Sequence, residues 1–513
     1  MKCGASLLRE TSAYGNALMI NAAAHSSWAR WAAFVAVALI GLAVRLPQLD
    51  ARPMHTDEAV NAYIVGQMLA GQAFNYDPQD RHGPALAALT FPLARIEGAR
   101  SFSDLTESKL RLTSVIAGAI TILLFGVAAD IFGFLPSLLA ALLFAVAPLP
   151  VYYDRYFIHE SLFCAATFGL ILTAWRASQT SSIGFGALAG ACAAFMVACK
   201  ETAILSMIAM AAATLLFSLL DLRGKSPVKS LRPRSLLAAA ATFVVLAAVL
   251  FTWFGRNGTA LTALIRAIPN LLARAGGQGH QKPFWYYGRL LTGGWSGGLL
   301  VALAILGLLI VLRKRDASPY RWLAYYGLSI AGIYSLTPYK TPWLALNLWL
   351  PITLFAAAAI EFFARRAANK LHRRAAAPVF CILLILLGVM IARDTRQRVF
   401  LHPADESNPY AYAQTSDDIL GLPVEIADLA RQRGISTPRI AVIAADPWPL
   451  PWYLRHFPQV GFWLPGQQWA DADFYVTSTD AGEQYAGRLA SFRPEFFGVR
   501  PGVLVLLWSP AQK

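Results

Sequence analysis

Long apolar runs recur along almost the whole chain, and they restrict the fold more than any other feature of the sequence. A helix needs roughly 20 apolar residues to cross a bilayer, and about eleven runs approach that length. They lie near 30–47, 112–130, 133–151, 157–175, 183–199, 202–221, 235–254, 295–312, 321–337, 342–364 and 378–393. Only 14% of the residues are charged, against about 25% in soluble proteins. The sequence therefore predicts a polytopic α-helical membrane protein with about eleven transmembrane helices.

Basic residues gather in three of the short loops between the apolar runs. The three clusters are Arg223, Lys225, Lys229, Arg232 and Arg234, then Arg313, Lys314, Arg315 and Arg321, then Arg365, Arg366, Lys370, Arg373 and Arg374. The loops fall on one side if the spans alternate, and the positive-inside rule makes that side cytoplasmic. We therefore expect a multi-pass protein of the cytoplasmic (inner) membrane, with its N-terminus inside and its C-terminal segment outside. The net charge is +15, and the basic residues cluster between the apolar runs. They therefore indicate membrane topology, and we expect no nucleic-acid partner.

The composition changes near Arg393, where polar residues, prolines and aromatics replace the long apolar runs. Strands are predicted over 439–445, 473–478 and 502–508, and helices over 424–434 and 480–491. This pattern favours a transmembrane domain over 1–393 and a small extracytoplasmic α/β domain over 394–513. In the first outer loop, 57–71 and 84–96 predict short helices that lie in the membrane interface.

The strongest local signal is His55-Thr56-Asp57-Glu58, which follows the first apolar run. An acidic pair at this place suits general-base chemistry, because a carboxylate accepts the proton of an attacking hydroxyl. The same residues also have a structural interpretation, in which Thr56 caps a helix and the two carboxylates oppose the helix dipole. Both interpretations stay open at this point.

With this motif the sequence resembles the GT-C superfamily of membrane glycosyltransferases, which includes protein O-mannosyltransferases and lipid A aminoarabinose transferases. Members carry an acidic pair after a span that ends in an arginine, here Arg45, and then a proline-containing motif and an arginine that opens the second span. The latter two are Arg81-His82-Gly83-Pro84 and Arg111. Other motifs are similar to a flippase-activity-associated branch: Tyr153-Asp154-Arg155-Tyr156 with His159-Glu160, Cys199-Lys200-Glu201-Thr202, Pro338-Tyr339-Lys340-Thr341-Pro342-Trp343, and Asp446-Pro447-Trp448 with Trp452-Tyr453-Leu454-Arg455. The resemblance covers nearly the whole chain, and the order of the motifs is its specific part.

The resemblance implies a GT-C fold and an inverting glycosyltransferase. This enzyme takes a sugar from a polyprenyl-phosphate-linked donor and passes it to an extracytoplasmic hydroxyl of a lipid, glycan or protein. Asp57 and Glu58 are then expected to be catalytic, with Asp57 as the base. The departing phosphate gains charge, and cationic side chains are expected to bind it: Arg155, Lys200 and Lys340. The expected substrate-binding residues are His55, His82, Asp154, His159, Glu160, Glu201 and Tyr339. Some members use a divalent cation. Two possibilities therefore stay open, a metal ion bound at Asp57 or no cofactor at all.

Two other classes of function compete with the enzyme: a flippase or transporter of a lipid-linked sugar, and a non-catalytic subunit of a glycosylation system. Transporters usually place ionisable residues near the middle of the bilayer. Here Arg155, Glu160 and Lys200 lie at the predicted outer ends of the apolar runs, and Asp130 and Glu361 lie at the cytoplasmic ends. This distribution favours an active site at one face, and the intact acidic pair argues against a non-catalytic subunit. The three phosphate candidates also have a structural interpretation, as anchors at the membrane boundary.

Overall fold

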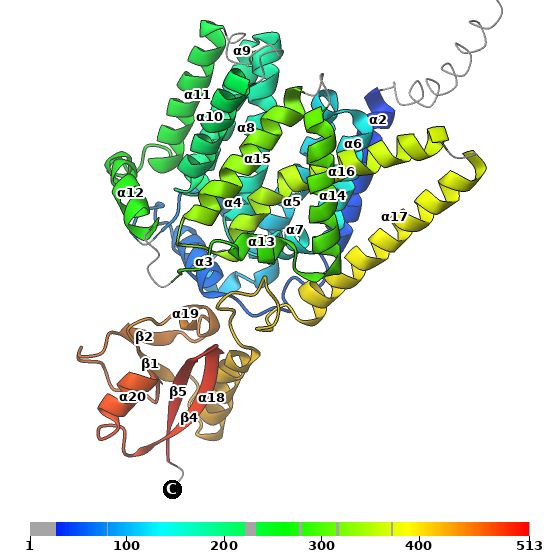
Figure 1. Cartoon of the computed structure of the whole chain (residues 1–513). Coiled ribbons are helices and arrows are strands. Elements are labelled where there is room, and N and C mark those ends of the chain that lie inside the picture. Colours follow the sequence, from blue (N-terminus) through cyan, green and yellow to red (C-terminus); the bar gives the residue numbers. More distant parts are fainter. Residues whose placement is uncertain are drawn as a thin grey trace, which may run out of the picture.

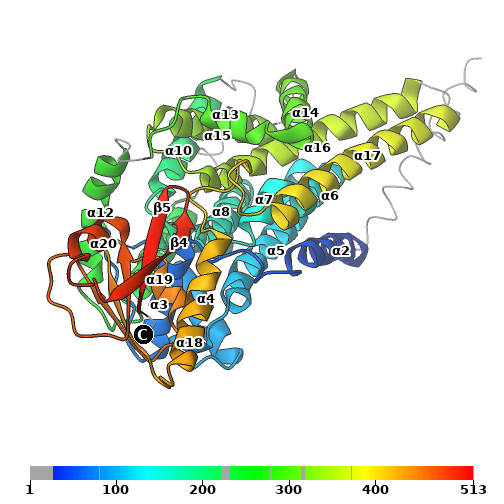
Figure 2. The ribbon, with the colours of Figure 1, turned by 90° about the horizontal axis from the view of Figure 1, so that it is seen from below.

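Long helices make up the larger part of the molecule, and a sheet-containing domain sits against one end of them (Figure 1). The computed structural model describes residues 27–79, 81–220, 232–275, 280–313, 318–370 and 373–511. Five of the predicted topology determinants, Arg223, Lys225, Lys229, Lys314 and Arg315, lie outside the described residues. Figure 2 views the same chain from the side of the sheet domain.

Every predicted apolar run is helical. The helices over these runs are α2 (Ser27–Arg45), α5 (Glu107–Phe132), α6 (Phe134–Val146), α7 (Pro148–Tyr153), α8 (Glu160–Thr180), α9 (Ile183–Cys199), α10 (Ala203–Leu220), α11 (Pro233–Phe251), α14 (Gly294–Arg313), α15 (Ser318–Leu336), α16 (Ala345–Lys370) and α17 (Arg373–Thr395). Within the described residues, eight helical segments are long and apolar enough to cross a membrane. The other three predicted spans correspond to α6 and α9, which are shorter, and to α15. The chain is therefore a multi-pass membrane protein.

The prediction of one continuous span over 133–151 is wrong. Helix α6 ends at Val146, Ala147 has an extended backbone with φ −66° and ψ 142°, and α7 begins at Pro148. Proline is favoured at the first position of a helix, and it disfavours the helical conformation in the residue before it. Pro148 therefore divides the run into two helices.

The helices differ in how much of their surface is buried inside the protein. In an apolar 18-residue stretch of Pro342–Ala367, the segment that contains most of α16, 94% is buried, whereas the share in an equal stretch of α2 or of α11 is 22%. Apolar residues on the outer helices face lipid in a membrane, which is as apolar as they are. Helix α16 therefore lies in the core, and the outer helices form the lipid-facing surface.

Two short helices form in the loop between α2 and α5, as predicted: α3 (Thr56–Leu69) and α4 (Ala85–Ile96). Helix α3 is largely buried in the protein, since Ala59, Ala62 and Val65 are fully inaccessible. Their position in the membrane interface stays a prediction. The segment between α11 and α14 contains α12 (Ala260–Ala275) and α13 (Tyr286–Leu291), which the sequence analysis did not predict.

The C-terminal domain contains a five-stranded mixed sheet with strand order β2-β1-β3-β5-β4. Its strands and helices are β1 (Arg439–Ile443), β2 (Gln459–Trp463), β3 (Phe474–Ser478), β4 (Phe492–Arg500), β5 (Val503–Pro510), α18 (Gly421–Gln432), α19 (Leu450–Tyr453) and α20 (Thr479–Tyr485). Strands β1, β3 and β5 and helix α18 were predicted. The sequence analysis missed β2 and β4, the two edge strands, because most of their residues are exposed or half-buried and lack a long apolar pattern. The predicted helix 480–491 ends early, at Tyr485.

The sheet domain contacts the helical part through α3 and the start of α5. The Trp452 indole donates to Glu107 at 2.9 Å, and the Tyr453 hydroxyl donates to the Met54 carbonyl at 3.3 Å. Arg500 donates to the Thr56 hydroxyl at 3.2 Å. These contacts hold the domain beside the loop that carries the acidic pair.

Candidate active site

The acidic pair sits at the start of α3, in the loop between the first two membrane-spanning helices. His55 is the N-cap of this helix, because its Nδ1 accepts a hydrogen bond from the Asp57 backbone N–H at 3.0 Å. In return, the Glu58 carboxylate accepts from the His55 backbone N–H at 3.0 Å. The alternative in which Thr56 caps the helix is therefore wrong.

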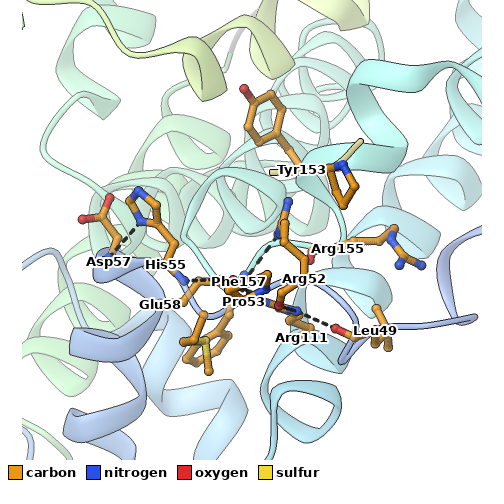
Figure 3. A network of polar contacts seen from close by, with 12 residues as sticks. Leu49, Arg52, Pro53, His55, Asp57, Glu58, Arg111, Tyr153, Arg155 and Phe157 are labelled. Carbon is orange, nitrogen blue, oxygen red and sulfur yellow. Dashed lines mark hydrogen bonds and ion pairs between the residues drawn. The ribbon is translucent and has the colours of Figure 1, made fainter. Parts of the chain in front are cut away.

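Glu58 is fully buried in a network with Arg111 of α5 (Figure 3). Its two oxygens accept from Arg111 Nε at 2.8 Å and from Arg111 Nη2 at 2.7 Å, and the Phe157 backbone N–H also donates to it at 2.8 Å. Burial raises the pKa of Glu58, but the ion pair and hydrogen bonds with Arg111 outweigh burial and lower this pKa to about 2. These contacts favour a structural role, so the predicted catalytic role of Glu58 gains no support from the geometry.

Asp57 has the opposite environment. Its side chain is exposed, and within the described residues its carboxylate forms neither a hydrogen bond nor an ion pair. Figure 3 shows it pointing away from the Glu58–Arg111 network. A free carboxylate at the surface is able to accept a proton from a bound substrate, so the geometry supports Asp57 and not Glu58 as the base.

Aromatic rings surround the start of α3. The His55 ring lies 5.3 Å from Tyr156 and 6.3 Å from Trp343, and Trp343 lies 5.8 Å from Tyr412. Tyr412 belongs to residues 402–416, which we call the strap and which lead from the end of the last membrane helix to the sheet domain. Four parts of the chain far apart in sequence thus meet at this site.

The strap is tied to the loop before α3 by hydrogen bonds. The Gln414 side chain donates to the Pro53 carbonyl at 3.1 Å, and the Thr415 hydroxyl donates to the Met54 carbonyl at 2.8 Å. His55 Nε2 lies 3.1 Å from the Tyr412 carbonyl. The strap therefore follows residues 53–55 closely.

Residues between α12 and α14 also reach the site. His280 Nδ1 lies 2.5 Å from the Tyr412 hydroxyl, and its ring lies 4.8 Å from that of Tyr339. Lys282 Nζ lies 5.4 Å from the centre of the Tyr412 ring. Tyr339, a predicted substrate-binding residue, is thus brought into the same group of rings.

Lys200 and Glu160, two further predicted site residues, form a buried ion pair. Burial lowers the pKa of Lys200, but the neighbouring Glu160 carboxylate outweighs burial and raises it. Lys200 Nζ also lies 5.9 Å from the centre of the Trp343 ring. The charged amine is therefore held against the aromatic wall of the site.

The structure uses the other two predicted phosphate ligands elsewhere. Arg155 donates to the carbonyls of Arg45 at 2.6 Å and Gln48 at 2.9 Å, at the C-terminal end of α2. Figure 3 places Arg155 on the far side of the network from Asp57. Lys340 donates to the Lys282 carbonyl at 3.2 Å and to that of Thr337. These contacts favour a structural role for both cations, against the prediction.

The remaining predicted substrate-binding residues pair with one another or with the scaffold. Asp154 accepts from Arg45 Nε at 2.9 Å, and both side chains are almost fully buried. His82 lies 2.9 Å from the Glu201 carboxylate, and its ring lies 5.2 Å from that of His159. His82 and Glu201 keep some exposure, whereas Asp154 is sealed off from solvent.

The geometry does not support a metal at Asp57. Within the part of the chain that the structure describes, no group of three or more His, Cys, Asp or Glu side chains is placed to hold a metal ion. The two neighbouring histidines have contacts of their own, His55 with the Asp57 N–H and the Tyr412 carbonyl, and His280 with the Tyr412 hydroxyl. We therefore derive no step through a metal.

A separate cleft of about 800 Å³ lies between the strap and the sheet domain. Its lining combines apolar residues at the end of the last membrane span with polar ones, including Leu401, Asp405, Glu406, Gln414 and Arg500. Asp57 does not line this cleft, so its carboxylate is unable to accept a proton from a molecule bound there.

Sequence reasoning missed two residues of this site, Tyr412 and Arg52. The Arg52 guanidinium is buried 4.5 Å from the centre of the Tyr156 ring, and its Nε has no hydrogen-bond partner in the described structure. Tyr412 lies more than three hundred residues after His55, whose Nε2 approaches its carbonyl. No local spacing links these residues, although the aromatics just after the last apolar run were a weak signal.

Part of the chain matches a known family. Residues 96–253 match the family model described as dolichyl-phosphate-mannose-protein mannosyltransferase. This segment contains Arg111, Glu160 and Lys200 but not Asp57. No curated protein sequence matches the chain significantly.

Solved structures share the fold of the chain. ArnT from Cupriavidus metallidurans bound to undecaprenyl phosphate has a TM-score of 0.61 and 17% sequence identity, over 92% of this chain and 97% of ArnT. The archaeal oligosaccharyltransferase AglB from Archaeoglobus fulgidus, in complex with an inhibitory peptide and a dolichol-phosphate, has a TM-score of 0.57 and 13% identity, over 94% of this chain and 76% of AglB. The predicted GT-C fold is therefore confirmed, whereas membership of the flippase-activity-associated branch stays a prediction.

Proposed function

We propose that this protein is a membrane glycosyltransferase that moves a sugar from a polyprenyl-phosphate-linked donor to a hydroxyl of an extracytoplasmic lipid, glycan or protein. The observation that carries the proposal is the exposed, unpaired carboxylate of Asp57 beside a wall of aromatic rings and lysines. The family match and the two solved relatives, whose structures contain undecaprenyl phosphate or dolichol-phosphate, support the choice of donor.

The proposed reaction is a single displacement with inversion at the anomeric carbon. Asp57 accepts the proton of the acceptor hydroxyl while its oxygen forms the new bond to the anomeric carbon. The bond from that carbon to the phosphate oxygen breaks, and the lipid phosphate leaves with the electron pair. A phosphate needs no proton in order to leave, but it needs cations near the charge that it gains.

Lys282 is the best placed cation for this phosphate, and Lys200, although it is ion-paired with Glu160, lies against the same wall of rings. Lys200 lies against Trp343, and Lys282 lies against Tyr412, which itself contacts Trp343. Arg155 and Lys340 are bound to backbone carbonyls, so we no longer assign the phosphate to them. The proposal therefore retains one of the three phosphate ligands expected from the sequence and adds Lys282.

The proposed orientation is that of the sequence analysis, with the N-terminus in the cytoplasm and Asp57, the strap and the sheet domain outside a cytoplasmic membrane. Lipid-linked donors and secreted acceptors meet on that face. The structure supports a common face for these parts, because the sheet domain packs on the loop that carries Asp57.

Replacement of Asp57 by asparagine tests the proposal. The amide keeps the size of the side chain but is unable to accept the proton. With the purified protein in liposomes and a panel of undecaprenyl-phosphate hexoses, we expect Asp57→Asn to lose roughly a hundredfold or more of the transfer rate. The matched control is Asp50→Asn, an exposed carboxylate in the same loop, which should transfer at the wild-type rate. Near-normal transfer by Asp57→Asn would show that Asp57 is not the base.

A further inference from the structure

The strap places the Tyr412 side chain at the site, and the neighbouring strap residues are buried around it. Tyr410, Gln414 and Thr415 are each no more than 4% exposed, whereas Tyr412 keeps part of its surface open. The next residue, Ala413, has φ +48°, a left-handed conformation that costs about 1 kcal/mol for a residue with a side chain. This turn lets Tyr412 reach the rings while Gln414 reaches Pro53.

Tyr412 and His280 form a polar pair next to Asp57. The Tyr412 hydroxyl lies 2.5 Å from His280 Nδ1. Burial lowers the pKa of His280, even though the nearby Asp57 charge raises it in part, and burial also raises the pKa of Tyr412. The His55 imidazole links the pair to the acidic loop, because His55 Nε2 lies 3.1 Å from the Tyr412 carbonyl and His55 Nδ1 accepts from the Asp57 backbone N–H at 3.0 Å.

A neutral pair of this kind has hydrogen-bonding capacity left over. If the tyrosine hydroxyl donates to Nδ1, its oxygen still accepts and the histidine Nε2–H still donates. If Nδ1–H donates to the tyrosine oxygen, the tyrosine O–H donates outward and Nε2 accepts. In both cases one group on the Tyr412 oxygen and one on the opposite side of the imidazole, at Nε2, stay available, and a sugar hydroxyl, which donates and accepts, suits the tyrosine oxygen in either case.

We infer that Tyr412, oriented by its hydrogen bond to His280, forms a subsite whose hydroxyl binds one hydroxyl of the transferred sugar beside Asp57. The strap then contributes directly to sugar specificity. A phosphate, which only accepts hydrogen bonds when ionised, matches the pair less well than a hydroxyl does. The Trp343 ring, 5.8 Å from Tyr412, supplies an apolar face next to the subsite. This inference rests on the proposed function, because it names the part of the donor that the pair recognises.

The test uses binding and transfer of farnesyl-phosphate-linked hexoses together with their 2-, 3-, 4- and 6-deoxy derivatives. Wild-type protein should bind one deoxy derivative about tenfold more weakly than the parent hexose, as expected for one lost hydrogen bond. Tyr412→Phe, which removes only the hydroxyl, should bind the parent hexose and that derivative equally. The single variant His280→Phe should also weaken binding of the parent hexose. In the double variant Tyr412→Phe/His280→Phe, the loss of binding free energy should be smaller than the sum of the losses in the two single variants, because the residues act as a pair.

Tyr152→Phe is the matched control. Its hydroxyl donates to the Pro403 carbonyl at 2.7 Å. This variant therefore removes a tyrosine hydroxyl that contacts the strap at a different place from the subsite. It should keep the wild-type discrimination among the deoxy derivatives. If Tyr412→Phe binds the hexose and still discriminates as wild type does, the subsite is refuted while the proposed function stands. If wild-type protein neither binds nor transfers any lipid-linked hexose, both the subsite and the proposed function are refuted.

Discussion

At the scale of single residues, the site shows how two adjacent carboxylates acquire different roles. Successive residues of a helix point about 100° apart, so Asp57 and Glu58 face different surroundings although both open α3. Glu58 points into the protein and meets Arg111, whereas Asp57 points out. The buried Glu58–Arg111 ion pair stabilises the loop, whereas the free carboxylate of Asp57 is able to accept a proton.

The ion pair of Glu58 predicts how stability depends on pH. The pKa of Glu58 is about 2 in the folded protein and 4.5 ordinarily, so folding favours the ionised form. Its contribution to stability is complete above pH 4.5 and is lost as the pH falls toward 2. Glu58→Gln leaves Arg111 buried without a charged partner, which costs about 3 kcal/mol at neutral pH.

Thermal unfolding in detergent between pH 7 and pH 3 checks this prediction. The variant should melt below the wild type at pH 7, and the difference should shrink below pH 4.5. Glu97→Gln, an exposed glutamate of the same outer loop, serves as the control and should match the wild type throughout. A difference that stays constant down to pH 3 would contradict the pKa of the buried group.

At the scale of elements, close contacts between helices and loops place the charged groups. Asp154 follows α7 and is held by Arg45 of α2, and it reaches this place only because Gly118 of α5 leaves room for it. A Cβ at position 118 would lie 2.3 Å from Asp154 Oδ2, which is too close for any contact. Three elements therefore depend on one missing side chain.

Gly118→Ala should consequently destabilise the protein. Alanine favours a helix by about 1 kcal/mol over glycine, but the clash with an aspartate that is locked by its ion pair should outweigh this gain and cost 1–3 kcal/mol, roughly. Gly332→Ala in α15 is the matched control, because nothing lies within 4 Å of its Cβ. Thermal unfolding should show a lower midpoint for Gly118→Ala and no loss for Gly332→Ala. Equal midpoints would mean that Asp154 moves freely.

At the scale of the whole molecule, the charged groups separate toward the two ends of the bundle. Helix α3, which carries Asp57, lies next to the sheet domain at the lower end of the helices in Figure 1. Asp130 pairs with Arg30 and Arg176, which lie at the start of α2 and near the end of α8. This arrangement fits an enzyme that works at one membrane face better than a transport path through the middle.

The proposed topology predicts the result of reporter fusions. A reporter that is active only outside the cytoplasm should be active when fused after Gln397, and it should be silent when inserted within 225–232, of which all but Arg232 lie outside the described residues. A cytoplasmic reporter should give the reverse pattern at both places. Cytoplasmic activity after Gln397 would place the sheet domain inside and remove the basis for an extracytoplasmic acceptor.

The sequence by itself determined the class of the fold, because the length and apolarity of a membrane helix are set by the bilayer and are readable without any tertiary contact. It also indicated Asp57, Lys200 and the core strands of the last domain, since each lies in a local pattern. Only the tertiary structure decided that Arg155 and Lys340 bind carbonyls, that Glu58 is buried, and that the Tyr412 carbonyl meets His55. Burial and pairing depend on segments that are hundreds of residues apart, and no local spacing encodes which of two similar charges finds a partner.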